Sequence, residues 1–462
     1  MTSHNTLGTG TKIGYATGSL ATGAFGTVPG LILLIYLTDT LGVAAGIAGL
    51  VVFLPKFWDV IFNPIVGAWS DRTNSKLGPR RPWMLAGGIL LPISFVFLFA
   101  TPAVLGPSGS AVYVMVFFLL SAAAYALFQV PYVSLPAEMT DDYEERTSIV
   151  SYRIVALTLG ILFSGALAPI LIHSAPDERR GYMLMGLVVA AFMGISMILS
   201  VIGTRSAPRT TVPRGEASLL VAFRAARTNP YFLPLWITFI IQALATAAML
   251  ASIPFLARYI LDNDAASSTL FVALVAPAIL FTPLWKSVGN RVGKTKGYVM
   301  ASLCFLAAAA TIAFAQAIPL VVLYLAVVLA GIGYAGMQLF PLAMLPDTVS
   351  VDEARSGERR SGMLTGLWTA GETGAFAIGP ALVGALLGLF GFVSTSGDQT
   401  AHQPDSALFG ITIAAGVLPV VAMGVSLLVL RRYRLSASVL QDEVTAAGLQ
   451  GETTASTQKR EE

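Results

Sequence analysis

Two charged residues, Lys56 and Asp59, stand inside a long apolar segment of this 462-residue chain. Residues three apart lie on one face of a helix, so these two side chains can reach each other. An ionisable side chain at membrane depth is costly to bury, and it usually faces a protein interior or a watery cavity on an ion or solute path. The pattern predicts a titratable transport site at Asp59. A structural ion pair with Lys56 that only fastens helices together is the alternative.

The elements that would position these residues are transmembrane helices. The chain is 55% hydrophobic and 11% charged, whereas soluble domains carry roughly a quarter charged residues. Apolar stretches long enough to cross a bilayer, about 20 residues each, are too long and uniform for barrel strands. We predict an all-α protein of twelve spans in a lipid bilayer, near residues 15–38, 43–69, 83–103, 111–135, 148–172, 181–203, 231–257, 267–289, 297–315, 319–345, 361–389 and 406–430.

Lysine and arginine are distributed unequally between the two sides. One side carries most of them, and the opposite side carries only Arg179, Arg180 and Arg258. Basic loops remain in the cytoplasm, so we expect a multi-pass protein of the cell membrane with both termini cytoplasmic. The net charge of +3 is small and gives no reason to propose nucleic acid as a partner. We expect a monomer.

The two halves of the chain repeat each other. The run from Pro64 to Arg72 is answered at the same spacing by Pro283 to Arg291, and Gln129-Val-Pro131 is answered by Gln338-Leu-Phe-Pro341. Two six-helix halves in parallel repeat are the arrangement of major facilitator transporters, whose solute site lies between the halves at the midplane. We therefore expect six-helix halves at 1–204 and 231–432, a cytoplasmic linker at 205–230 and a disordered cytoplasmic tail at 433–462.

Three connections carry more specific motifs. They comprise Asp59, Asn63-Pro64, Ser70-Asp71-Arg72 and Arg80-Arg81-Pro82-Trp83; then Pro131 to Arg146; then Leu345-Pro-Asp347 to Arg359-Arg360. These motifs resemble those of the glycoside-pentoside-hexuronide:cation symporters, the family of the bacterial melibiose carrier. The resemblance covers the chain from about Lys12 to the end of the twelfth span. It implies cation-coupled symport of a sugar, glycoside or related small solute by alternating access.

The resemblance also implies roles for single residues. Asp59 matches the first coupling carboxylate of the family and Lys56 the basic residue one turn before it, while Arg153 and Tyr125 match residues that border the sugar. Other positions depart from the family. Its remaining cation and sugar ligands fall at neutral residues of this chain: Asn63, Gln129, Val133, Thr373 and about Gly23, with an additional carboxylate at Glu372.

These departures bear on the coupling ion. Sodium is a hard cation that benefits from several oxygen ligands and more than one carboxylate, yet Asp59 is accompanied by the neutral Asn63, Gln129 and Thr373. A proton needs only one titratable group. We therefore expect a proton rather than sodium at Asp59, and no cofactor or metal. Two features oppose this expectation, because amide oxygens also ligate sodium and Glu372 is a second candidate proton carrier.

Five residues are candidates for the solute site with alternative roles. Trp368 can stack on a sugar ring or pack between helices. Gln129 and Gln338 can hydrogen-bond a solute or each other, and Arg153 with Glu372 can instead form an ion pair between the fifth and eleventh spans. A cytoplasmic gate is expected from the charged residues of the loops, namely Asp71, Arg72, Arg80, Arg81, Arg146, Arg359 and Arg360.

Other functions remain open from the sequence. A proton-driven exporter, an amphiphile or lysolipid transporter and a non-transporting sensor would all fit this scaffold. An intramembrane enzyme would need a nucleophile with a base or a metal cluster. The histidines, His4, His173 and His402, fall outside the predicted spans, and Cys304 is the single cysteine. A transporter is therefore favoured over an enzyme.

Overall fold

The computed structural model describes residues 7–140, 142–207, 219–356, 361–396 and 402–435, together with residues 439, 441 and 445. Within these residues, twelve helices are long and apolar enough to cross a membrane. The all-α, twelve-span prediction is confirmed. Residues 208–218 of the expected linker and most of the expected tail lie outside the described residues, as do Arg359 and Arg360.

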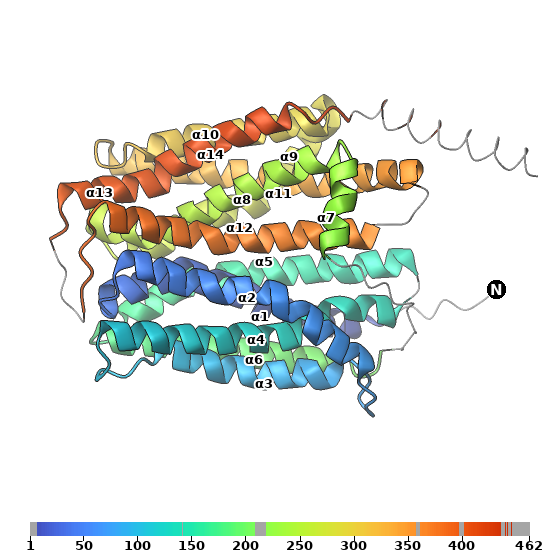
Figure 1. Cartoon of the computed structure of the whole chain (residues 1–462), viewed down its shortest axis with the longest axis horizontal. Coiled ribbons are helices and arrows are strands. Elements are labelled where there is room, and N and C mark those ends of the chain that lie inside the picture. The colour runs from blue at the N-terminus through green and yellow to red at the C-terminus, as the bar shows by residue number, and fades with distance from the viewer. Residues whose placement is uncertain are drawn as a thin grey trace, which may run out of the picture.

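The first six spans form one bundle, drawn from blue to green in Figure 1. Two of their N-termini are capped by aspartate side chains, Asp142 on the amide of Glu145 and Asp177 on the amide of Arg180. Such caps satisfy backbone donors that a helix leaves free. The helices of this half are α1 (Thr9–Ile35) with the π-helical turn η1 (Tyr36–Thr40), α2 (Ala45–Arg72), α3 (Arg81–Phe99), α4 (Pro107–Met139), α5 (Tyr143–His173) and α6 (Glu178–Gly203).

The last six spans form a second bundle beside the first (Figure 1). Two of its spans contain a π-helical turn. The helices are α8 (Phe232–Phe255) with η2 (Leu256–Ile260), α9 (Ala266–Val292), α10 (Lys294–Ile312), α11 (Leu320–Ser356), α12 (Ser361–Leu389) and α13 (Asp405–Thr412), which continues through η3 (Ile413–Val417) into α14 (Leu418–Leu430).

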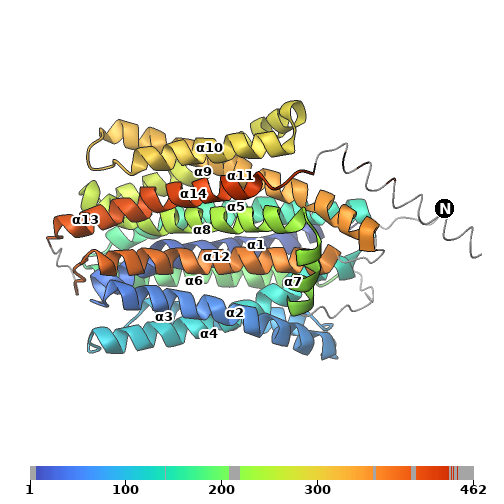
Figure 2. The same ribbon diagram turned by 45° about the horizontal axis from the view of Figure 1, so that its top comes forward.

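One short helix, α7 (Leu219–Thr228), lies within the expected linker. Figure 2 shows it crossing the ends of the long helices instead of running along them. It packs against α8 and α12. Directly after it, Asn229 donates a hydrogen bond of 2.9 Å to the carbonyl of Thr348, which ties this connection to α11. The linker is therefore anchored to the second half.

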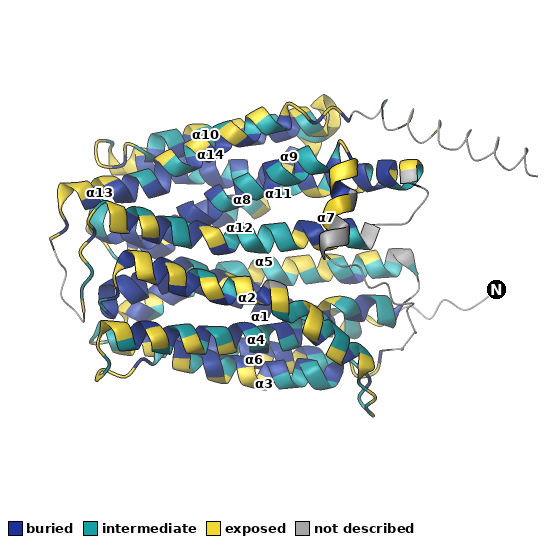
Figure 3. Ribbon diagram, in the orientation of Figure 1, coloured by how far each residue is buried: buried dark blue, intermediate teal, exposed yellow. Residues whose placement is uncertain are grey.

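Burial follows the faces of the long helices, which carry buried and exposed residues along their length (Figure 3). Exposed positions include large apolar side chains such as Ile154, Leu159 and Ile195. Apolar outer faces are what lipid requires, because a bilayer core offers no hydrogen bonds to polar groups. The span formed by α1 and η1 is the most enclosed of the twelve, so its residues face protein on most sides.

The two halves meet mainly through three helix pairs: α2 with α12, α5 with α9, and α1 with α8. We call the end where α1 turns into α2 the far end, and the opposite end, which holds residues 9 and 430, the termini end. The closest approaches lie toward the far end. A methyl group at Gly49 would lie 2.9 Å from the carbonyl of Ala381, and Ser268 donates a hydrogen bond of 2.9 Å to the carbonyl of Ala166.

Candidate functional site

Asp59 lies in the middle of α2 and is only 5% exposed. Its Oδ1 atom is buried and, among the described residues, accepts no hydrogen bond. No contact within the 4.0 Å limit of an ion pair joins it to Lys56 among the residues described. Lys56 Nζ instead lies 5.7 Å from the ring centroid of Phe25. The ion-pair alternative is therefore wrong in this conformation, although the two charges remain close enough to interact.

Two cations of the first half, Lys56 and Arg153, lie against aromatic rings. The Phe25 ring on α1, which faces Lys56, stacks on Tyr125 of α4 at 4.6 Å. The guanidinium of Arg153, on α5, lies 5.7 Å from the ring centroid of Tyr132. A cation over an aromatic face is attracted by the ring quadrupole. Lys56, Tyr125 and Arg153 therefore belong to aromatic clusters on the helices α1, α2, α4 and α5 of the first half.

The three neutral candidates for cation coupling are distributed over both halves. Gln129 on α4 has a buried Oε1 atom without a hydrogen-bond partner among the described residues. Asn63 lies one turn beyond Asp59 on α2 and is half-buried, as is Thr373 on α12. The structure thus places two unpaired oxygen acceptors, from Asp59 and Gln129, in adjacent helices of one half.

The second half contributes Gln338, Glu372 and Trp368. Gln338 Nε2 donates a hydrogen bond of 2.8 Å to the hydroxyl of Tyr334, and Glu372 lies within electrostatic reach of that tyrosine. The described residues form no ion pair between Glu372 and Arg153. Trp368 is 2% exposed and stacks on Phe239 at 4.5 Å. That environment suits the packing role considered for this tryptophan.

Asp59 and Glu372 lie at the same depth. The helices α2 and α12 run antiparallel and meet where Gly49 approaches Ala381 and Gly384. Both helices extend from that contact toward the termini end. After ten residues, a distance of about 15 Å along a helix, α2 reaches Asp59 and α12 reaches residues 371–374. The buried Asp59 and the half-buried Glu372 therefore belong to opposite halves at the level where major facilitator proteins bind solute.

Gly23, at the position of the family's first-span acid, lies where α1 crosses α5. A methyl group there would lie 2.5 Å from the carbonyl of Leu157 and 3.0 Å from the amide of Ile161. Contacts shorter than 3.0 Å to backbone atoms force one of the helices to move. A side chain at this position, acidic or not, is therefore incompatible with the observed packing of α1 on α5.

We expect Gly23→Ala to destabilise the protein by about 1–3 kcal/mol, the usual range for overpacking. Gly26, one turn further along α1, is the matched control, because a methyl group there meets nothing within 4 Å. Thermal unfolding of the purified variants, followed by tryptophan fluorescence, should show a lower midpoint for Gly23→Ala and an unchanged one for Gly26→Ala. Equal midpoints would mean that α1 and α5 are not in this close contact.

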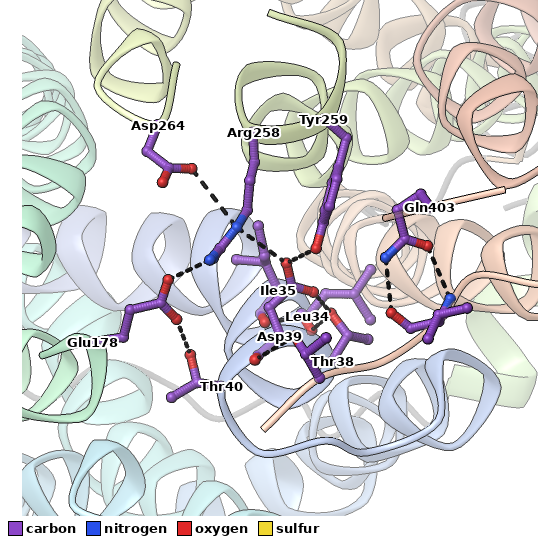
Figure 4. A network of polar contacts seen from close by, with 12 residues as sticks. Leu34, Ile35, Thr38, Asp39, Thr40, Glu178, Arg258, Tyr259, Asp264 and Gln403 are labelled. Atoms are coloured by element: carbon purple, nitrogen blue, oxygen red, sulfur yellow. Dashed lines mark hydrogen bonds and ion pairs between the residues drawn. The ribbon is translucent and has the colours of Figure 1, made fainter. Parts of the chain in front are cut away.

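A second polar cluster, which the sequence analysis did not identify, joins the two halves at the far end (Figure 4). Arg258 of η2 is 7% exposed, and its guanidinium contacts Glu178 at the start of α6 at 2.5 Å. It also lies 3.7 Å from Asp39 of η1, which is 0% exposed. Tyr259 donates a hydrogen bond of 2.6 Å to the same carboxylate. We call Asp39, Glu178, Arg258 and Tyr259 the far-end latch.

Backbone contacts reinforce the latch. In the segment after α12, the amide of Thr395 donates to the carbonyl of Thr38 at 2.9 Å, and its hydroxyl donates to the carbonyl of Asp39 at 2.8 Å. Ser394 donates to the carbonyl of Val43 at 2.9 Å. Polar contacts from two segments of the second half, η2 and the segment after α12, therefore join the first half at the far end. Asp264, also of the second half, lies 3.9 Å from Arg258.

Several contacts of the loop charges at the termini end lie within the first half. Arg80 bridges Asp71 at 2.5 Å and Glu138 at 2.6 Å. Arg81 donates to the carbonyl of Thr204 and so caps the end of α6, and Arg146 donates to the carbonyl of Thr140 at 3.0 Å. These arginines hold the loops of the first half in place in this conformation. Arg72 is exposed at the end of α2.

The sequence signals for the latch were weak. In the sequence, Arg258 is one of three basic residues on the side of the membrane that carries few of them. Asp39 lies at the end of an apolar stretch, where a charged residue is common. Charged residues at the ends of the first, sixth and seventh spans would have been the one available clue. Their meeting depends on the docking of the two bundles.

Comparison with known proteins agrees with this arrangement. The family model described as MFS/sugar transport protein matches residues 14–437. The chain is 25% identical to an uncharacterized symporter of Synechocystis sp. (88% of this chain, 91% of the relative). It is 26% identical to the glucuronide carrier protein homolog of Escherichia coli (92% of each). It is also 21% identical to the sodium-dependent lysophosphatidylcholine symporter 1 of Gallus gallus (76% and 72%).

A solved structure shares the fold. A bacterial homolog of the human lysosomal transporter Spinster, described as inward-facing and unoccupied, superposes with a TM-score of 0.62 at 16% identity, covering 93% of this chain and 98% of the other. The expected major facilitator fold is confirmed, and the chain is a membrane transporter, not an enzyme. It belongs to the MFS/sugar transport protein family, and the resemblance to the glycoside-pentoside-hexuronide:cation symporters is confirmed.

Proposed function

We propose that this protein is a proton-coupled symporter of a sugar, glycoside or related small solute, with Asp59 as the proton carrier. The supporting observation is the Asp59 carboxylate, which is buried at mid-membrane without a hydrogen-bond partner among the described residues. A buried carboxylate without a hydrogen-bond partner is penalised when it is charged. Protonation removes that penalty, so a change in the surroundings of Asp59 would load and release a proton.

The distribution of basic residues supports a cytoplasmic location for the termini end and a cell-membrane location for the protein. With that orientation, the far-end latch would close the extracellular side. The charged loops of the termini end would then form their gate when the cytoplasmic side closes. In that state the gate residues would act between the halves, namely Asp71, Arg72, Arg80, Arg81, Arg146, Arg359 and Arg360.

The proposal predicts which gradient drives transport. Purified protein in liposomes is expected to accumulate a labelled methyl glucoside or methyl glucuronide under an inward proton gradient, and not under an inward sodium gradient at equal pH. One transported proton per solute gives up to about tenfold accumulation per pH unit, since 1.4 kcal/mol corresponds to a factor of ten. Accumulation driven by sodium alone would exclude the proton as the coupling ion.

An amphiphile is the second candidate solute, because the chain is similar to a symporter named for lysophosphatidylcholine. The same liposomes with labelled lysophosphatidylcholine separate the two solute classes. Polarity in intact cells separates uptake from a proton-driven exporter, which would lower the cellular content of the solute. The absence of transport of any of these solutes would favour a sensor.

A further inference from the structure

A small pocket inside the second half is lined by aromatic and polar side chains of three helices. It lies near the middle of α8, α11 and α12, at the depth of Asp59. The residues that the argument uses are Phe239, Gln242 and Thr246 of α8, Tyr334 and Gln338 of α11, and Phe376 of α12. Phe239 and Gln242 are buried, whereas Tyr334, Gln338 and Phe376 are half-buried. The residues of α11 and α12 therefore form the more accessible side of the pocket.

Gln242 presents an unsatisfied acceptor in this pocket. The residue is 1% exposed, and its Nε2 atom donates to the hydroxyl of Ser302 at 2.9 Å and to that of Ser426 at 3.1 Å. Its Oε1 atom is buried and has no hydrogen-bond partner among the described residues. A buried acceptor left unpaired is unfavourable, so a donor that bonds to this atom would remove that penalty.

The orientation of the Gln242 amide is determined by its neighbours. Ser302 already donates its hydroxyl proton to the carbonyl of Tyr298, and Ser426 donates its proton to the carbonyl of Met423, both at 2.8 Å. Each serine can therefore only accept a hydrogen bond from Gln242. Rotating the amide would place its oxygen against two oxygens that have no proton to offer. The oxygen, and not the nitrogen, is the free atom.

Tyr334 supplies the complementary donor. Its hydroxyl oxygen accepts a hydrogen bond of 2.8 Å from Gln338 Nε2, which leaves its own proton for another acceptor. The side of the pocket formed by Phe239 is backed by Trp368, which stacks on that ring at 4.5 Å. Glu372 lies within electrostatic reach of Tyr334 and would repel an anionic group. The pocket thus combines a free acceptor, a free donor and aromatic walls without a cation.

We propose that this pocket is a solute subsite of the second half that holds one hydroxyl group of the transported molecule. A hydroxyl group both donates and accepts, so it can donate to Gln242 Oε1 and accept from Tyr334. This inference rests on the proposed transport of a sugar or glycoside. It assigns recognition of an uncharged hydroxyl group of that solute to α8 and α11.

Binding of methyl β-glucoside and methyl β-glucuronide to the purified protein, measured by isothermal titration calorimetry, tests the subsite. Gln242→Met and Tyr334→Phe each remove one hydrogen-bonding group while keeping most of the side-chain volume. We expect each to raise the dissociation constant of both glycosides about tenfold or more, because a site built to bond a hydroxyl discriminates strongly once a partner is lost. Thermal unfolding of every variant is recorded in parallel.

Ser426→Ala is the matched control. It removes one partner of Gln242 Nε2 but retains Ser302 and the free oxygen, so a purely structural role of Gln242 predicts similar effects for the two substitutions. We expect Ser426→Ala to change the dissociation constants less than twofold. If Gln242→Met does not fold, Tyr334→Phe carries the test. Unchanged binding in the folded variants would overturn the subsite alone, whereas wild-type protein that binds neither glycoside would overturn the proposed solute class as well.

Discussion

Asp59→Asn is expected to abolish accumulation of solute under a proton gradient while leaving exchange of internal for external solute intact. The carboxylate is buried and lacks a hydrogen-bond partner among the described residues, so in this position it can cycle between protonated and charged forms. Asparagine has nearly the same shape but cannot take up a proton. The variant should therefore pass through its solute-loaded states and equilibrate solute without concentrating it.

The measurement compares liposomes that contain wild type, Asp59→Asn and Glu372→Gln. Wild type should reach up to about tenfold accumulation per unit of pH difference, whereas Asp59→Asn should stop at equal concentrations on the two sides. Glu372 is a half-buried acid at the same depth, so Glu372→Gln is the control for the loss of a carboxylate other than that of Asp59. Full proton-driven accumulation by Asp59→Asn would show that Asp59 is not the proton carrier. Loss of accumulation in Glu372→Gln alone would show the same.

Arg258→Ala is expected to open the far end. Arg258 lies between Glu178 and Asp39, and Asp39 is completely buried. Removing one partner of a buried charge cluster typically costs about 3–5 kcal/mol, because the remaining carboxylates lose their cation. Since the contacts of Arg258 with these acids join the two halves, that cost applies to the state with the far end closed. A shift of about 3 kcal/mol would change the ratio of closed to open molecules roughly a hundredfold.

Spin labels at Ser174 and Asn263, exposed positions of the two halves at the far end, report this change. Pulsed electron–electron distance measurements should show a longer separation in Arg258→Ala than in the parent. Arg180→Ala is the control, because Arg180 is 71% exposed and pairs with Asp177 of its own half. An unchanged distance distribution in Arg258→Ala, or an equal shift in Arg180→Ala, would show that the latch does not determine the state.

The helices and their grouping into halves followed from the sequence alone. Each span is a local property, because about 20 apolar residues must form a helix to satisfy their backbone groups in lipid. The paired motifs from Pro64 to Arg72 and from Pro283 to Arg291 indicated the repeat, and the loop motifs indicated the family. Asp59 was identified because it is a charged residue inside an apolar run. The free-energy cost of burying a charge in the membrane is evident without knowledge of any neighbouring residue.

The partners of these charges were decided only by the tertiary structure. Spacing on α2 predicted a contact of Lys56 with Asp59, but the packing of α1 places the Phe25 ring beside the lysine instead. The latch joins Arg258 to a residue 80 positions away and Tyr259 to one 220 positions away. Helical periodicity reports which residues share a face, and it does not report which two faces meet. For the same reason, only the tertiary structure shows that the Oε1 atom of Gln242 is free. Its Nε2 atom is bound by Ser302 and Ser426, which belong to two other helices.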